Sequence, residues 1–201
     1  MADLPQDETT EVIIRDSTDQ TKELFVNVDG SARTSTDSGL ATYSAGFVGL
    51  VPPASATDIF TITGSATKTV RIKFIQMSAS TTSGSGVAFN LSIVKRSTAN
   101  SGGTSTTATA VPHDSTSAAG TAVVRGYTAN PTVGTLVGVV RATRTEAVTA
   151  GTSRQIGEYT FSNKNDQSIV LRGTSEVLAV NLNGASVTGP VVGCSIEWTE
   201  E

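Results

Sequence analysis

The chain has 201 residues, 37% of them hydrophobic, and a formal net charge of −4. Its single cysteine excludes an internal disulfide and a cysteine-based zinc cluster, and no apolar stretch approaches the roughly 20 residues that a membrane helix needs. Threonine (32) and serine (23) dominate, with valine and isoleucine spread throughout. Because β-branched side chains suit the pleated surface of a sheet, the composition predicts an all-β protein.

Charge divides the chain into two parts. Residues 1–37 carry nine acidic and three basic side chains, whereas residues 38–201 carry nine and eleven. Neither part is basic enough to predict nucleic acid binding. The acidic, polar N-terminus is the opposite of a secretory signal, so we expect synthesis and assembly in the cytoplasm. An acidic segment ahead of a near-neutral region indicates a docking arm, with a merely solubilising tail as the equal alternative.

Two short apolar runs follow the polar N-terminus, EVIIRD at 11–16 and ELFVNVDGS at 23–31. They predict a small hairpin, or an extended arm that pairs with a neighbouring subunit. The pair Pro52-Pro53 forces extended geometry and ends this region. We therefore expect an extended arm over residues 1–55 and a sandwich domain over residues 56–201. The candidate partner-binding residues on the arm are Val12, Ile13, Ile14, Leu24, Phe25 and Val26.

From residue 58 onward the apolar residues recur with the period of two that is typical of strands. Nine candidate strands follow: DIFTIT at 58–63, TVRIKFIQM at 69–77, VAFNLSIVKR at 87–96, TAVVRGY at 121–127, TLVGVVRATR at 135–144, IGEYTF at 156–161, SIVLRG at 168–173, EVLAVNL at 176–182 and VVGCSIEW at 191–198. In the second of them Val70 and Ile72 alternate until Ile75 and Met77 take over, which predicts a bulge. No segment has a helical period.

About eight short antiparallel strands in about 140 residues predict a two-sheet sandwich, with the jelly roll as the commonest solution. An immunoglobulin-like sandwich is the runner-up, but the Cys…Trp…Cys spacing is absent. In the last candidate strand, Cys194 and Trp198 share one face with Val192 and Ile196, so we expect both to be buried.

The only histidine, His113, stands next to Asp114 within residues 97–120, which contain almost no large apolar side chain. Adjacent loop residues do not hold an imidazole in one catalytic pose, so we predict a solvated loop histidine. We expect residues 97–120 to form a surface loop.

The aspartates at positions 16, 19 and 29 offer loosely spaced oxygens without the pattern of a calcium loop, so turns are the better interpretation. No catalytic residue, cofactor-binding residue or metal ligand is predicted, and we expect neither an enzyme nor a cofactor.

Five stretches have a distinctive amino-acid sequence: GLVPPASATDIFTITGSATKTVRIKFIQ at 49–76, IVKRSTANSGGTS at 93–105, YTANPTVGTLVG at 127–138, VLRGTSEVLAVNLNGASV at 170–187 and the terminal IEWTEE. They resemble small structural proteins encoded by tailed bacteriophages, in which similar strand pairs and loop entries recur. The resemblance covers about residues 43–201. LFVNVDGSARTS at 24–35 is similar to the arm that such proteins place before the sandwich. The likeness contains no catalytic motif.

The resemblance implies a virion component at the capsid surface, assembled in the host cytoplasm. The first hypothesis is a capsid decoration (cement) protein, commonly a homo-trimer, that binds the outer surface of the major capsid protein lattice. The alternative is a tail-fibre, collar or head-spike module that binds the host surface. A sandwich hydrolase is the third and losing hypothesis. We expect no nucleic acid or membrane partner, and residues 97–120 would serve as a display loop or an inter-subunit contact.

Overall fold

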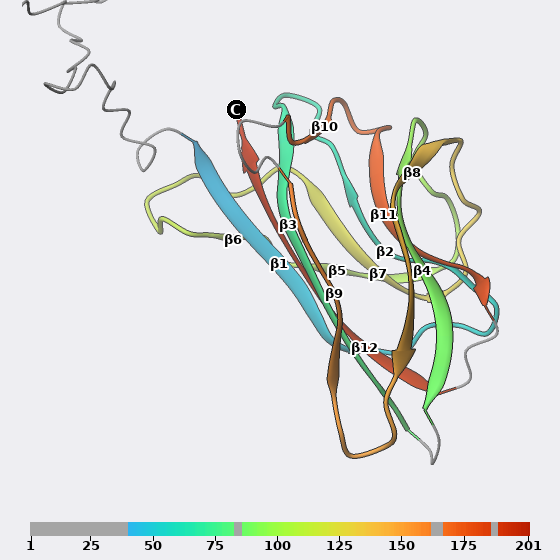
Figure 1. Ribbon diagram of the computed structural model, residues 1–201. Coiled ribbons are helices and arrows are strands. Elements are labelled where there is room, and N and C mark those ends of the chain that lie inside the picture. Colours follow the sequence, from blue (N-terminus) through green and yellow to red (C-terminus); the bar gives the residue numbers. More distant parts are fainter. Residues whose placement is uncertain (1–39, 83–85, 162–166, 186–188) are drawn as a thin grey trace, which may run out of the picture. The chain divides into compact units, whose positions relative to one another are not determined.

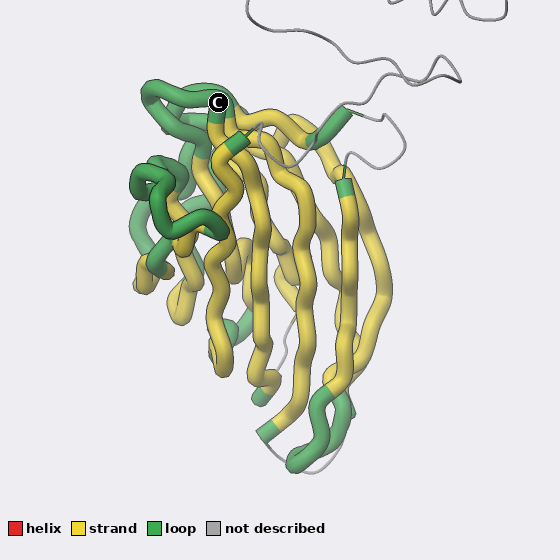
Figure 2. The backbone as a smooth tube through the Cα atoms, turned by 90° about the vertical axis from the view of Figure 1, so that its left-hand side faces the viewer, coloured by secondary structure: helices red, strands yellow, loops and turns green. Residues whose placement is uncertain are grey.

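The computed structural model describes residues 40–82, 86–161, 167–185 and 189–201. Twelve strands make up its regular structure, and Figure 2 shows that strands and their connections account for all of it. They are β1 (Ala41–Leu50), β2 (Ala56–Thr63), β3 (Val70–Thr81), β4 (Val87–Arg96), β5 (Thr104–Ala108), β6 (Val111–Pro112), β7 (Val123–Ala129), β8 (Leu136–Ala147), β9 (Arg154–Thr160), β10 (Ile169–Leu171), β11 (Val177–Ala185) and β12 (Pro190–Glu200). Within these ranges no helix has the length and hydropathy to cross a bilayer.

The strands form two antiparallel sheets that pack face to face (Figure 1). The first sheet has the order β10-β3-β12-β1-β6, with β9 also beside β3, and the second has the order β5-β7-β2-β11-β4-β8. Strands β1 to β4 alternate between the sheets and pair in turn with β12, β11, β9 and β8. This is the winding of a jelly roll, in which a long antiparallel hairpin wraps into two layers. The predicted fold class is confirmed.

Three strands extend this jelly roll, and all of them come from the segment between β4 and β8. Strands β7 and β5 continue the second sheet beyond β2, and β6 pairs with β1 at the edge of the first sheet. Residues 97–120 therefore contain two strands where the sequence indicates only a surface loop. The apolar pattern misses β5 because four of its five residues are exposed and none of the five is large and apolar.

The core lies between the sheets and follows the predicted alternation. In β3 the inward positions are Val70 and Ile72, then Ile75 and Met77, and the register against β12 shifts at that point. The predicted bulge is confirmed. Every second residue of β12 from Val192 to Trp198 is also buried, as expected.

Strand β1 lies inside residues 1–55, which the sequence assigns to an extended arm. It is nevertheless an inner strand of the first sheet, between β12 and β6, and the compact unit runs from Leu40 to Glu201. Tyr43 is fully buried and stacks on Trp198, with ring centroids 5.8 Å apart. Because the small residue Ala45 stands between the inward rings of Tyr43 and Phe47, and the apolar Val48 after them is exposed, the sequence of β1 has no conspicuous apolar period. The sandwich therefore begins earlier than position 56.

Candidate functional site

The second sheet ends at β8, a twelve-residue strand that pairs with β4 and with no other named strand in the described chain. Eight large hydrophobic side chains are exposed among the described residues, and four of them lie within seven positions at the start of β8. We call this group the β8 edge; it consists of Val133, Leu136, Val137 and Val139. A long apolar edge strand with free backbone groups is a site for pairing with another chain.

The apolar surface continues from the β8 edge onto the outer face of the second sheet. Val139 stands opposite Val94 on β4, and Val94 stands opposite Ala179 on β11. Val94 and Ala179 are buried and form, with Val177, a small cluster separate from the main core. The edge is thus the exposed margin of a packed apolar layer.

The other half of β8 is more polar and carries two cationic side chains and one anionic side chain. Arg141 and Arg144 are exposed, with Glu146 after them. The Arg141 guanidinium lies over the ring of Phe161, 5.7 Å from its centroid, a cation–π contact. An incoming strand would therefore meet apolar side chains at one end of β8 and positive charge at the other.

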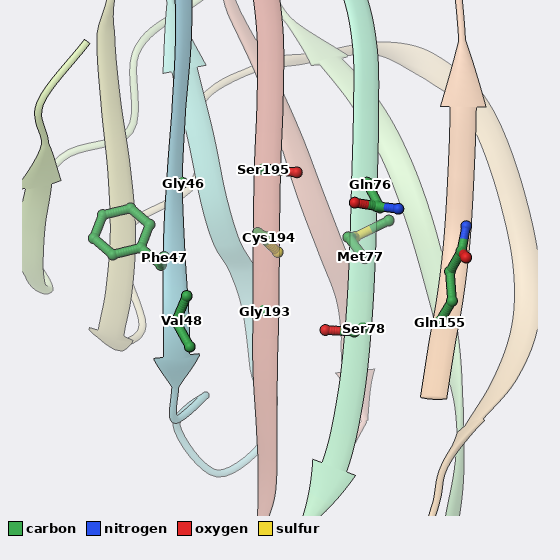
Figure 3. Close-up of a pocket in the computed structure, with 10 residues that line it drawn as sticks. All are labelled: Gly46, Phe47, Val48, Gln76, Met77, Ser78, Gln155, Gly193, Cys194 and Ser195. Atoms are coloured by element: carbon green, nitrogen blue, oxygen red, sulfur yellow. The ribbon is translucent and has the colours of Figure 1, made fainter. Parts of the chain in front are cut away.

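A groove of about 330 Å³ lies on the first sheet, across β1, β12, β3 and β9 (Figure 3). Small residues, among them Gly46 and Gly193, form much of its lining, and none of its lining side chains is charged. A Cβ on Gly46 would lie 2.6 Å from the carbonyl oxygen of Cys194, so glycine keeps these neighbouring strands close. A ligand in this groove would be held by its shape and by uncharged polar contacts, without an ion pair to the lining.

Cys194 is 3% exposed, and burial raises the pKa of its thiol to about 12. At pH 8 the thiolate fraction is then roughly 1000-fold smaller than for a free cysteine. We expect the native protein to react with a thiol reagent slower than the urea-unfolded protein by about this factor. Absorbance after addition of an aromatic disulfide measures both rates. Equal rates would contradict the buried position.

His113 and Asp114 follow the short strand β6 on an exposed turn. The Asp114 carboxylate accepts hydrogen bonds from the backbone N–H and the hydroxyl of Thr116, at 2.9 and 2.7 Å, and these bonds lower its pKa. The backbone N–H of His113 donates to the carbonyl oxygen of Thr42 at 2.8 Å. These hydrogen bonds fix a turn against β1, and His113 is exposed, as the prediction of a solvated loop histidine requires.

The six predicted partner-binding residues lie outside the described residues, as do the three aspartates considered for calcium. They are Val12, Ile13, Ile14, Leu24, Phe25 and Val26, and Asp16, Asp19 and Asp29. Among residues that the structure describes, no group of three or more His, Cys, Asp or Glu side chains is placed to hold a metal ion.

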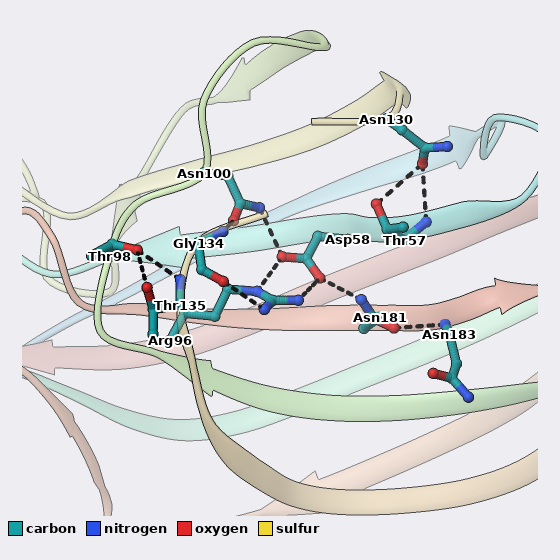
Figure 4. A network of polar contacts seen from close by, with 10 residues as sticks. All are labelled: Thr57, Asp58, Arg96, Thr98, Asn100, Asn130, Gly134, Thr135, Asn181 and Asn183. Carbon is teal, nitrogen blue, oxygen red and sulfur yellow. Dashed lines mark hydrogen bonds and ion pairs between the residues drawn. The ribbon is translucent and has the colours of Figure 1, made fainter. Parts of the chain in front are cut away.

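A buried ion pair that the sequence does not reveal lies between β2 and β4 (Figure 4). Arg96 binds Asp58 through two hydrogen bonds of 2.7 Å, and both residues are at most 5% exposed. Asn100 and Asn181 donate to the same carboxylate at 2.8 and 2.6 Å. Four donors therefore satisfy this buried carboxylate, as burial of a charge requires.

The same network connects the loop after β4 with the loop before β8. Arg96 donates to the carbonyl oxygen of Gly134 at 2.9 Å, and the Gly134 N–H donates to the Asn100 side chain at 2.9 Å. A Cβ on Gly134 would overlap the carbonyl oxygen of Thr98, so this close approach needs glycine. The ion pair thereby holds residue 134, and with it the start of the β8 edge, against the sheet.

A second buried carboxylate, Glu200, ties the C-terminal strand to the segment before β7. It accepts hydrogen bonds from the indole N–H of Trp198, from the backbone N–H groups of Thr121 and Ala122, and from the Thr121 hydroxyl, at 2.7–2.9 Å. Burial raises the pKa of Glu200, but these hydrogen bonds outweigh it and hold the pKa below its ordinary value of 4.5.

Ionised Glu200 therefore stabilises the fold, fully above pH 4.5 and progressively less as pH falls through the lower folded-state pKa. We expect Glu200→Gln to lower the free energy of unfolding by about 1–3 kcal/mol at pH 7, because the amide NH2 that replaces one carboxylate oxygen cannot accept the hydrogen bonds made there. The variant should also lose less stability than wild type between pH 5 and pH 3 in urea titrations. Glu197→Gln, on the same strand, is the control. An unchanged acid dependence in Glu200→Gln would contradict this role.

No protein-family model, curated protein or solved structure matches this chain.

Proposed function

We propose that the chain is a structural protein of a tailed-bacteriophage virion, a decoration protein that binds the outside of the major capsid protein lattice and stabilises the head. The β8 edge carries this proposal, because it gathers half of the exposed large hydrophobic side chains of the described residues on, and just before, a strand with a free side. The sequence resemblance to phage structural proteins supports the choice of partner.

Binding at a strand edge suits a protein that acts by repetition. A strand of the partner that adds to β8 gains main-chain hydrogen bonds, and the apolar side chains beside it lose contact with water. Each contact is modest, but a lattice repeats it at every equivalent position and so links neighbouring capsid subunits. The buried networks around Asp58 and Glu200 hold the sandwich rigid, which lowers the entropic cost of docking.

The acidic N-terminal segment is a second proposed contact. Its apolar runs at 11–16 and 23–31 would lie along the capsid surface as added strands, and Val12, Ile13, Ile14, Leu24, Phe25 and Val26 remain the candidate partner-binding residues. Assembly as a homo-trimer is part of the same proposal.

One observation favours the alternative, a fibre, collar or head-spike module that binds the host surface. The outer face of the second sheet holds a small cavity lined by Thr61 and Tyr127, whose hydroxyls make no hydrogen bond with the described residues, and polar linings of this kind bind saccharides. A module of this kind would be present in few copies at one position of the virion.

Heads assembled without this protein provide the test. Purified protein is mixed with these heads and sedimented, and the bound amount is measured against the major capsid protein. The proposal predicts saturable binding at a fixed ratio to the major capsid protein, and heads that withstand heating better. Absence of binding to heads, with a few copies on the tail or collar of complete virions, would contradict it in favour of the alternative.

A further inference from the structure

A cavity of about 230 Å³ lies on the outer face of the second sheet. Its lining includes Thr61 on β2, Arg125 and Tyr127 on β7, and Val177 on β11, with Asn100 from the loop after β4. This volume lies below the usual range for drug-sized ligands, so it suits a single small ring. The cavity is centred on β7, β2 and β11, and its lining includes none of the four residues of the β8 edge, although Asn100 also bonds Gly134 beside that edge.

Two hydroxyl groups of the lining belong to buried residues and have no partner among the described residues. Tyr127 is 3% exposed and Thr61 is 2% exposed, and neither side chain makes a hydrogen bond with any described residue. Neither hydroxyl is among the fully enclosed unsatisfied atoms, so solvent reaches both oxygens, and both residues line the cavity. A hydroxyl of a buried residue that has no protein partner is bonded by whatever fills the space beside it, so these two hydroxyls are available to a ligand that enters the cavity.

Two other polar side chains of the lining, Asn100 and Thr121, are in contrast bonded to the protein. Asn100 uses its amide on Asp58 and its carbonyl on the Gly134 N–H. The Thr121 hydroxyl is bonded to Glu200 and Ser65. These groups build the wall, and the free hydroxyls are left for a ligand.

Charge and apolar area narrow the class of ligand. Arg125 is the only charged side chain of the lining; it is exposed and makes no ion pair or side-chain hydrogen bond with the described residues. A guanidinium binds a carboxylate through two parallel hydrogen bonds. Val123 and Val177 add apolar surface for the C–H face of a ring.

We propose that this cavity binds a sugar acid of the uronate class, with its carboxylate on Arg125 and its ring hydroxyls on Thr61 and Tyr127. The site goes beyond the proposed capsid docking, because its lining contains none of the four residues of the β8 edge. On a virion it would take an acidic polysaccharide through one uronate residue.

Calorimetric titration of the full chain with D-glucuronate tests the proposal, with D-glucose and acetate as probes that lack the carboxylate or the ring. Glucuronate should bind more tightly than either. Arg125→Gln should weaken its binding about 10- to 100-fold, and Tyr127→Phe or Thr61→Val about 3- to 10-fold each. Tyr159→Phe, which removes the same atom from β9, should bind like wild type.

Thermal unfolding distinguishes a variant that has lost a contact with the ligand from a variant that has lost its fold. Tyr127→Phe removes a hydroxyl that has no partner in the described part of the protein, so the melting temperature of this variant should equal or exceed that of wild type. The proposal is overturned if glucuronate does not bind to wild type, or if glucose binds equally well. It is also overturned if Tyr127→Phe, Thr61→Val and Arg125→Gln all bind glucuronate like wild type.

Discussion

Asp58→Ala is expected to lower the free energy of unfolding by about 3–5 kcal/mol, the usual cost of removing one partner from a buried ion pair. The substitution leaves the Arg96 guanidinium buried beside two amides that also lose their acceptor. Urea titration at pH 7, followed by tryptophan fluorescence, measures the loss, because Trp198 is fully buried in the core.

Two further variants sharpen this prediction. Arg71 and Glu201 form an ion pair on the surface, with side chains about one-third exposed, so Glu201→Gln should cost only about 0–1 kcal/mol. Replacing both buried partners, as in Asp58→Asn with Arg96→Met, should recover part of the loss, since no uncompensated charge remains. A cost below about 1 kcal/mol for Asp58→Ala would show that the ion pair does not hold the loops as described.

Lysine at two positions of the β8 edge is expected to abolish attachment to heads. In Val137→Lys with Val139→Lys, two exposed apolar contacts become charges that docking would have to desolvate, so affinity should fall at least about 100-fold. Because both side chains are more than half exposed, the free energy of unfolding should change little. Co-sedimentation with heads measures the binding.

The opposite edge of the same sheet provides a matched control. Ser105→Lys with Thr107→Lys places the same charges on β5, whose side chains there are exposed and polar. This control should bind heads like wild type. If the β5 variant loses binding and the β8 variant retains it, docking uses another surface. If the β8 variant turns a trimer into a monomer in sedimentation, the β8 edge joins copies of this chain.

The sequence predicts those strands whose apolar side chains alternate strictly. Strand β12 is the best case, since burial on the inner face selects every second residue from Val192 to Trp198. Strand β3 shows that even a bulge is visible, because the alternation changes phase where the extra residue is inserted. The apolar pattern does not reveal strand β5, since its threonines and serine pair with β7 through the backbone and the strand buries no large side chain.

The candidate sites depend on tertiary neighbours, and the sequence holds less information about them. Asp58 and Arg96 are 38 positions apart, and only the placement of β2 and β4 on either side of β11 brings them together. Strand β8 is recognisable as a strand, but its place at the edge follows from the strand order. In retrospect the sequence contains a signal for an exposed apolar edge. Leu136, Val137, Val139 and Val140 place apolar side chains on both faces of β8, whereas a strand with one solvated face needs them only on the face in the core.

Backbone amide exchange on head-bound protein tests most directly whether the sandwich acts by docking through β8. Alternate N–H groups of an edge strand point away from its only neighbour and exchange freely in the unbound protein. We predict that hydrogen–deuterium exchange in Leu136–Ala147 slows when the protein is bound to heads, while exchange in Thr104–Ala108 stays as in the free protein. Unchanged exchange in β8, with protection on another strand or loop, would contradict the account.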